Sequence, residues 1–212
     1  MRRGSSLRII HMIRPDPVTA SLLFLSFCFV LSGLLGCIYA DRCDLSAKTA
    51  FRDYLTDYFW WVEKTGTSVP FGRCLLLYLS GVCAVFLLGF SSAGVVAVPL
   101  LSVGFGFLSF YTVSCFAQSF GKDGVILAAA LIGLRLFFTL PCFFAVSCKA
   151  LLRSLWLAAL ALGHSKKIPS NNRGYFLMFL LCLICLCIGV FCERIVTPLL
   201  FRAAVNTINL SP

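Results

Sequence analysis

The chain has 212 residues, of which 60% are hydrophobic and only 12% are charged. Soluble domains carry about 45–50% apolar and about 25% charged residues, so this chain has too few charged side chains to coat a water-soluble globule. The composition excludes a soluble domain, a disordered chain and a small disulfide-stabilised protein. It predicts an all-α polytopic membrane protein.

The formal net charge of +10 comes from 18 Lys and Arg residues against 8 Asp and Glu residues. In a soluble protein such an excess can indicate nucleic-acid binding. In a membrane protein, basic residues instead hold loops on the cytoplasmic side and attract anionic headgroups. We therefore expect the basic segments to contact membrane lipids and expect no nucleic acid as a partner.

The N-terminal part reads as a basic segment followed by a membrane span. Residues 1–18 contain four Arg and one Asp, and residues 19–40 form an uncharged apolar run. About 20 apolar residues are needed to cross a bilayer core of about 30 Å. A signal peptide has a shorter apolar region that ends in small residues, and a lipoprotein cleavage before Cys37 is disfavoured by Leu35. A retained first transmembrane helix is the better interpretation.

Residues 41–73 are the only long polar stretch, and apolar residues recur in it at helical spacing. The pattern predicts one outward-facing amphipathic helix that lies on the membrane or on the bundle. Aromatic side chains are favoured at protein interfaces, so five of them are candidate partner-docking residues: Tyr54, Tyr58, Phe59, Trp60 and Trp61. The alternative is that these rings only anchor the helix at the headgroups.

Four further spans are predicted in the remaining sequence. The uncharged block after residue 73 is long enough for two helices, at 73–91 and 95–117, with a tight turn at residues 91–94. A short polar loop follows at residues 118–124. The last two spans are 125–148 and 175–192, separated by a basic cytoplasmic segment at 149–174 and followed by an outside C-terminal tail at 193–212. Residues 149–163 are a further apolar stretch that could extend the fourth helix or lie in the interface, and a sixth span formed by them is the alternative.

The distribution of charge predicts the orientation. With five spans and a cytoplasmic N-terminus, the inside carries nine basic residues and one acidic residue, and the outside carries eight basic and seven acidic residues. Basic residues concentrate in cytoplasmic loops. We therefore expect a multi-pass membrane protein with its N-terminus in the cytoplasm.

The sequence offers no set of residues suited to catalysis or to binding a cofactor or metal. Cys182, Cys185 and Cys187 have a metal-like spacing, but they lie among apolar residues where a thiolate would be costly. Residues 89–92 (GFSS) resemble the nucleophile region of an intramembrane serine protease only faintly, because no histidine or acidic residue occurs in any predicted span to act as a base. We expect a non-enzymatic protein.

Arg135 lies ten residues into the predicted fourth span, where a charge costs at least about 2.5 kcal/mol. Pro141 has no amide hydrogen, so it frees the carbonyl of Phe137 as a possible acceptor, and Ser114 and Tyr111 are further possible partners. The pair Arg135 and Pro141 is either a functional polar site or an internal packing bond. Gly104 and Gly106 are predicted to let a neighbouring helix approach closely.

The order of these elements resembles the stage II sporulation protein M family. The resemblance lies in the run LLGFSSAG, in a following Pro and Gly-Phe pair, in Pro141 with Phe143, and in the C-terminal run ERIVTPLL. These runs occupy the following positions: residues 87–94, Pro99, residues 104–107 and residues 193–200. The chain length, the outside loop and five spans also match. The family often has Pro with an amide, or His and Asn, where this chain has Leu134, Arg135 and Leu136.

The resemblance implies a membrane scaffold of endospore-forming bacteria with no enzymatic activity. Such a protein works in the mother-cell septal and engulfing membrane. It holds the peptidoglycan hydrolases called stage II sporulation proteins D and P at the septum for septal thinning and forespore engulfment. A homo-oligomer is compatible with this role. The main alternative is a membrane subunit of a transporter or permease, for which only Arg135 and Pro141 offer polar features in a span.

Overall fold

The computed structural model describes residues 16–42, 49, 53, 71–163 and 172–208, and these residues are almost entirely helical. In lipid every backbone amide and carbonyl needs an internal partner, and helices supply one for each residue. The all-α prediction is confirmed for the described residues. The elements are α2 (Pro17–Arg42), α4 (Phe71–Leu88), α5 (Gly94–Ala128), the π-helical turn η1 (Ala129–Gly133), α6 (Leu134–Ala161) and α7 (Asn172–Ile208).

Four of the helical segments are long and apolar enough to cross a membrane. They are Pro17–Arg42, Gly94–Ser119, Leu134–Ala161 and Arg173–Glu193. The protein is therefore a membrane-embedded helical protein with several spans. Helix α4 has 18 residues, which rise about 27 Å, slightly less than the bilayer core of about 30 Å. It is the remaining helix at the place of the predicted second span.

The helices begin and end at somewhat different residues from those predicted. Helix α2 starts at Pro17, before the predicted residue 19, because proline is well suited to the first helical position, where its missing amide hydrogen costs nothing. Helix α6 continues from Leu134 to Ala161 in one piece, so residues 149–161 extend this helix and do not form a separate helix. The buried side chains of Ala150, Leu151 and Ser154 hold this extension on the core.

Two predicted non-helical segments are helical. Residues 193–208, predicted as part of the tail, continue α7. Residues 118–124, predicted as a polar loop, are helical except at Gly121, where φ is 62° and ψ is −135°. Only glycine adopts this conformation at little cost. The break at Gly121, together with the π-helical turn η1, connects α5 to α6.

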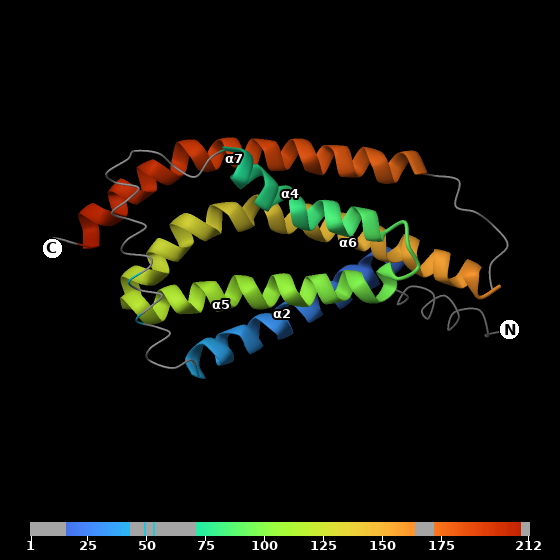
Figure 1. Cartoon of the computed structure of the whole chain (residues 1–212), viewed down its shortest axis with the longest axis horizontal. Coiled ribbons are helices and arrows are strands. Elements are labelled where there is room, and N and C mark those ends of the chain that lie inside the picture. Colours follow the sequence, from blue (N-terminus) through green and yellow to red (C-terminus); the bar gives the residue numbers. More distant parts are fainter. Residues whose placement is uncertain (1–15, 43–48, 50–52, 54–70, 164–171, 209–212) are drawn as a thin grey trace, which may run out of the picture.

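The helices form an elongated bundle in which neighbours along the chain run in opposite directions (Figure 1). Helix α5 lies beside α2 on one side, and α6 lies between α5 and α7. The start of α2, the α4–α5 turn, the end of α6 and the start of α7 lie toward one end of the bundle. At the opposite end, the Gln118 amide donates to the Asp41 carboxylate over 3.1 Å, which links α5 to α2.

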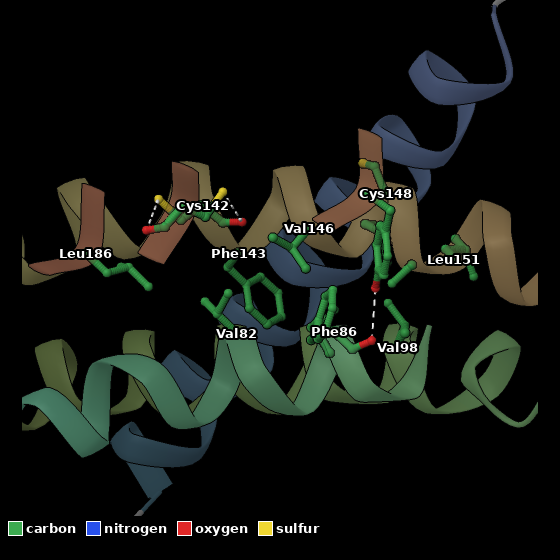
Figure 2. Close-up of a cluster of buried hydrophobic side chains, with 14 of the residues drawn as sticks. Val82, Phe86, Val98, Cys142, Phe143, Val146, Cys148, Leu151 and Leu186 are labelled. Atoms are coloured by element: carbon green, nitrogen blue, oxygen red, sulfur yellow. Dashed lines mark hydrogen bonds between the residues drawn. The ribbon is translucent and has the colours of Figure 1, made fainter. Parts of the chain in front are cut away.

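The core lies between α4, α6 and α7. Figure 2 shows Phe143 and Val146 of α6 pointing toward Val82 and Phe86 of α4. Leu186 of α7 also belongs to this cluster. One side chain each from α2 and α5 completes the contacts between all five helices: Leu25 and Val98.

Small residues let α2 and α5 approach closely. A Cβ atom added to Gly106 would meet the backbone oxygen of Phe29, and one added to Gly36 would lie 2.6 Å from the backbone oxygen of Phe107. The Ser102 hydroxyl donates to the carbonyl of Leu25 over 3.3 Å. Such contacts drive association in lipid, where burying apolar surface between helices gives little gain.

The two glycines predicted to pack differ in this respect. Gly106 is buried against α2, as expected, whereas a Cβ atom on Gly104 would meet nothing within 4 Å. The prediction for Gly104 is therefore wrong within this chain. The two residues are about 200° apart around the helix, so only one of them can face α2.

Candidate functional site at the α4–α5 turn

The turn at residues 91–93 is held by hydrogen bonds to its own backbone and to α6. The amide of Ala93 donates to the Ser91 hydroxyl oxygen over 3.2 Å. The hydroxyl of Ser154 on α6 donates to the carbonyl oxygen of Ser91 over 2.7 Å and approaches that of Ser92 at 3.3 Å. The polar groups of this turn therefore serve to fix α4 and α5 on α6.

Two glycines flank the turn because other helices come very close to it. A Cβ atom on Gly89 would meet the hydroxyl of Tyr175 and would lie 3.1 Å from Cα of Ala150. One on Gly94 would lie 2.8 Å from the Ser154 hydroxyl oxygen. Residues with a side chain at these two positions would separate the turn from α6 and α7.

Tyr175 connects the start of α7 to the end of α4. Its hydroxyl donates to the carbonyl oxygen of Phe86 over 2.9 Å, and its ring stacks on that of Phe86 with centroids 4.9 Å apart. The ring of Phe179, one turn further along α7, stacks on the same phenylalanine at 3.9 Å. Phe86 is thus enclosed by two aromatic rings of α7.

Arg153 of α6 lies over this aromatic cluster. Its guanidinium carbon is 4.3 Å from the ring centre of Phe90 and 5.2 Å from that of Tyr175. Arg153 was predicted to lie in a basic cytoplasmic segment and was not among the candidate site residues. The signal that could have found it is a lone basic residue in an apolar helical stretch, with the aromatic Phe90 beside a predicted turn.

The other polar candidate, Arg135, occupies the second position of α6, directly after the π-helical turn. The backbone stays helical from residue 122 through η1 into α6, so Arg135 lies well inside a continuous helix and not at its start. Thr139 donates to its carbonyl oxygen over 2.9 Å. The proposed partner Ser114 donates instead to the thiol of Cys37, at 3.2 Å. Pro141 is exposed, and α6 passes through it without ending.

The three cysteines with metal-like spacing point in different directions. Cys182 is buried, Cys185 is half-buried and Cys187 is exposed. Cys182 instead pairs with Cys142 of α6, since each thiol approaches the other residue's carbonyl oxygen, at 3.8 and 3.9 Å (Figure 2). Among the described residues, no group of three or more His, Cys, Asp or Glu side chains is placed to hold a metal ion.

The five aromatic docking candidates, Tyr54, Tyr58, Phe59, Trp60 and Trp61, lie outside the described residues, as do both histidines. The described site is therefore the junction of the α4–α5 turn with α6 and α7. The groups at this junction are the Arg153 guanidinium, aromatic rings and hydroxyl groups. Such groups are suited to packing helices together and to binding a ligand.

The fold and this junction define the class: a polytopic helical membrane protein. Comparison with protein-family models, with curated proteins and with solved structures finds no match for the chain.

Two buried serines of α6 give a matched test of the junction. Both hydroxyls are fully buried, but that of Ser147 has no hydrogen-bond partner, whereas that of Ser154 holds the turn. An unpaired buried hydroxyl is unfavourable, so Ser147→Ala should leave the stability unchanged or raise it by up to about 1 kcal/mol. Ser154→Ala should lower it by about 1–2 kcal/mol, since a membrane hydrogen bond contributes about that much. Thermal unfolding in a mild detergent measures both, and equal losses would contradict the assignment.

Proposed function

We propose that this chain is a non-enzymatic membrane scaffold of endospore formation that resembles stage II sporulation protein M. In this role it holds peptidoglycan hydrolases, the stage II sporulation proteins D and P, at the septum for septal thinning and forespore engulfment. It resides in the mother-cell septal and engulfing membrane with its N-terminus in the cytoplasm.

The observation that carries the proposal is that the residues of the α4–α5 turn make structural hydrogen bonds. Residues 87–94 carry much of the family resemblance, and the structure describes all of them. Both Ser91 and Ser92 contribute carbonyl oxygens that accept from Ser154, and the Ser91 hydroxyl accepts from the backbone. A residue engaged in this way maintains the frame of the bundle. A stable frame that presents its loops to partners is what a scaffold requires.

The buried polar groups also favour a scaffold over the alternative, a transporter or permease subunit. Transport sites present polar or charged groups near the middle of the membrane. Within the described part of the chain, the buried polar side chains of serine and threonine are six hydroxyls. Five of them donate to backbone carbonyl oxygens: Ser21, Ser32, Ser102, Thr139 and Ser154.

The segment at residues 41–73 is the proposed docking surface for partners outside the cytoplasm. Its five acidic residues balance its five basic residues, so long-range attraction contributes little and aromatic anchors carry the binding. The exposed faces of the described helices are apolar and suit lipid.

Co-purification from sporulating cells tests the proposal. An affinity-tagged chain is expected to retain the two hydrolases, and a variant with Tyr54, Tyr58 and Trp61 all changed to Ala is expected to lose at least tenfold of them at normal membrane abundance. The physical reason is that a few large aromatic residues dominate most protein interfaces. Quantitative mass spectrometry of the purified material gives the measurement.

The matched control replaces three exposed aromatic rings on the described helices, Phe27, Phe137 and Phe191, by Ala. This control removes as many rings but only from the helix surfaces, so the hydrolases should be retained. If the parent chain retains neither hydrolase, the scaffold proposal fails. If the control loses them and the triple variant does not, the docking surface is on the helices.

A further inference from the structure

We propose that Arg153, together with Lys149 and Arg173, binds the phosphate group of an anionic phospholipid at the end of the bundle that contains the α4–α5 turn. This inference is independent of the scaffold proposal, because it concerns the lipid partner of a different part of the chain.

Arg153 is pre-positioned for an anion. Its guanidinium lies against the rings of Phe90 and Tyr175, at 4.3 and 5.2 Å from their centres. A cation held against aromatic faces is stabilised there and loses conformational freedom. These contacts involve the positive charge of the guanidinium, whose five N–H donors can still bind a phosphate. The side chain is half-buried, so it reaches the surface.

The position of Arg153 is at the boundary between lipid and water. Tyr175, which it contacts, is two residues from Arg173, where the apolar span of α7 begins. The turn at residues 91–93, which is exposed and polar, lies at the same end of the bundle and is bonded to Ser154, the residue after Arg153. Three separate elements thus place polar groups at the level of Arg153, where lipid phosphates lie.

Two further cations lie on the same two helices, near Arg153 in the sequence of α6 and near Tyr175 in that of α7. Lys149 is exposed and lies one helical turn before Arg153 on α6, and Arg173 is exposed in the first turn of α7. Lysine side chains extend along apolar surface to bring the ammonium group to the headgroup region. The two helices therefore bring three positive charges to one end of the bundle.

These charges have no protein counter-charge in the part of the chain that the structure describes. Arg153 interacts there with aromatic rings only. No ion pair joins any of the three cations to a described carboxylate, including the exposed Asp16 at the start of α2. Like charges gathered at a partly dehydrated surface repel each other. An anion between them removes this repulsion, and basic pockets between membrane helices bind anionic headgroups in this way.

Lipid binding by the purified full-length protein in mild detergent tests the inference. Native mass spectrometry is performed with phosphatidylglycerol and with phosphatidylcholine of the same acyl chains. The parent is expected to bind phosphatidylglycerol at least tenfold more tightly than phosphatidylcholine. Arg153→Leu is expected to lose this preference, and Arg153→Lys to keep part of it, because lysine retains the charge but not the planar donors.

Two further variants make the result specific. Arg42→Leu removes a cation at the end of α2, at the opposite end of the bundle, and should bind as the parent does. The double variant Lys149→Ala with Arg173→Ala changes only exposed side chains; it should fold normally and still lose at least threefold of the preference. An unchanged preference in both Arg153→Leu and the double variant overturns the proposal. So does loss of the lipid to an equal concentration of inorganic phosphate, which would identify free phosphate as the ligand.

Discussion

Gly106→Leu is expected to lower the free energy of unfolding by about 3 kcal/mol or more, because overpacking a close contact forces the backbones apart. The new side chain would meet the carbonyl of Phe29 and the hydroxyl of Ser32, and both are fixed on α2. The hydrogen bond from Ser102 to Leu25, one turn away, should then be lost as well. Thermal unfolding in detergent, followed by circular dichroism, measures the effect.

Gly104→Leu is the control, since it is the same change on the same helix. Nothing lies within 4 Å of a Cβ atom at this position. Leucine is preferred over glycine in helices by about 0.8–1 kcal/mol, so the stability should stay the same or rise slightly. Equal destabilisation by both substitutions would show that α2 and α5 do not meet at Gly106, whereas oligomer dissociation in Gly104→Leu alone would place a second copy at this face.

Tyr175→Ala is expected to lower the stability by about 3–5 kcal/mol, the range for removing a large buried aromatic side chain. The change removes the stacking on Phe86, the contact with Arg153 and the hydrogen bond to α4. Tyr175→Phe removes only the hydrogen bond and should cost about 1 kcal/mol. The same unfolding assay separates the two contributions.

Leu177→Ala, two residues further along α7, is the control for Tyr175. Leu177 is 61% exposed, so its truncation should change the stability by less than about 0.5 kcal/mol. If Tyr175→Ala is no more destabilising than Leu177→Ala, then α7 does not dock on the α4–α5 turn as described.

The sequence pattern was sufficient for the helical class and for the approximate positions of the described helices, but not for their ends. Continuous apolar runs mark spans strongly, and the positions of α2 and of the first part of α5 follow from them. The end of α6 was left open between an extension of the fourth helix, an interfacial segment and a sixth span, because Lys149 and Arg153 also resemble the start of a basic loop. Lys149 is exposed, whereas the charge of Arg153 lies against aromatic rings. The contact of Arg153 with these rings depends on the tertiary structure.

The candidate site was predictable only in part. Gly89 and Gly94 stand in a run that indicated a tight turn, but their close contacts with Tyr175 and Ser154 depend on how α6 and α7 pack. Gly104 and Gly106 were predicted equally to pack against a neighbouring helix, although they lie on different faces of α5. A comparison of the small residues of α2 with the two faces of α5 would have favoured Gly106.

We propose that α4 crosses the membrane as a fifth span, which would place the α4–α5 turn on the same side as the N-terminus. Single cysteines at Ser92 and Gln118, introduced with Cys43→Ser, report on the two ends of α5. Both side chains are exposed. In intact cells a membrane-impermeant maleimide should label position 118, whereas position 92 should react only after permeabilisation. Labelling of position 92 in intact cells with protection of position 118 would mean that α4 does not cross, and would contradict the account.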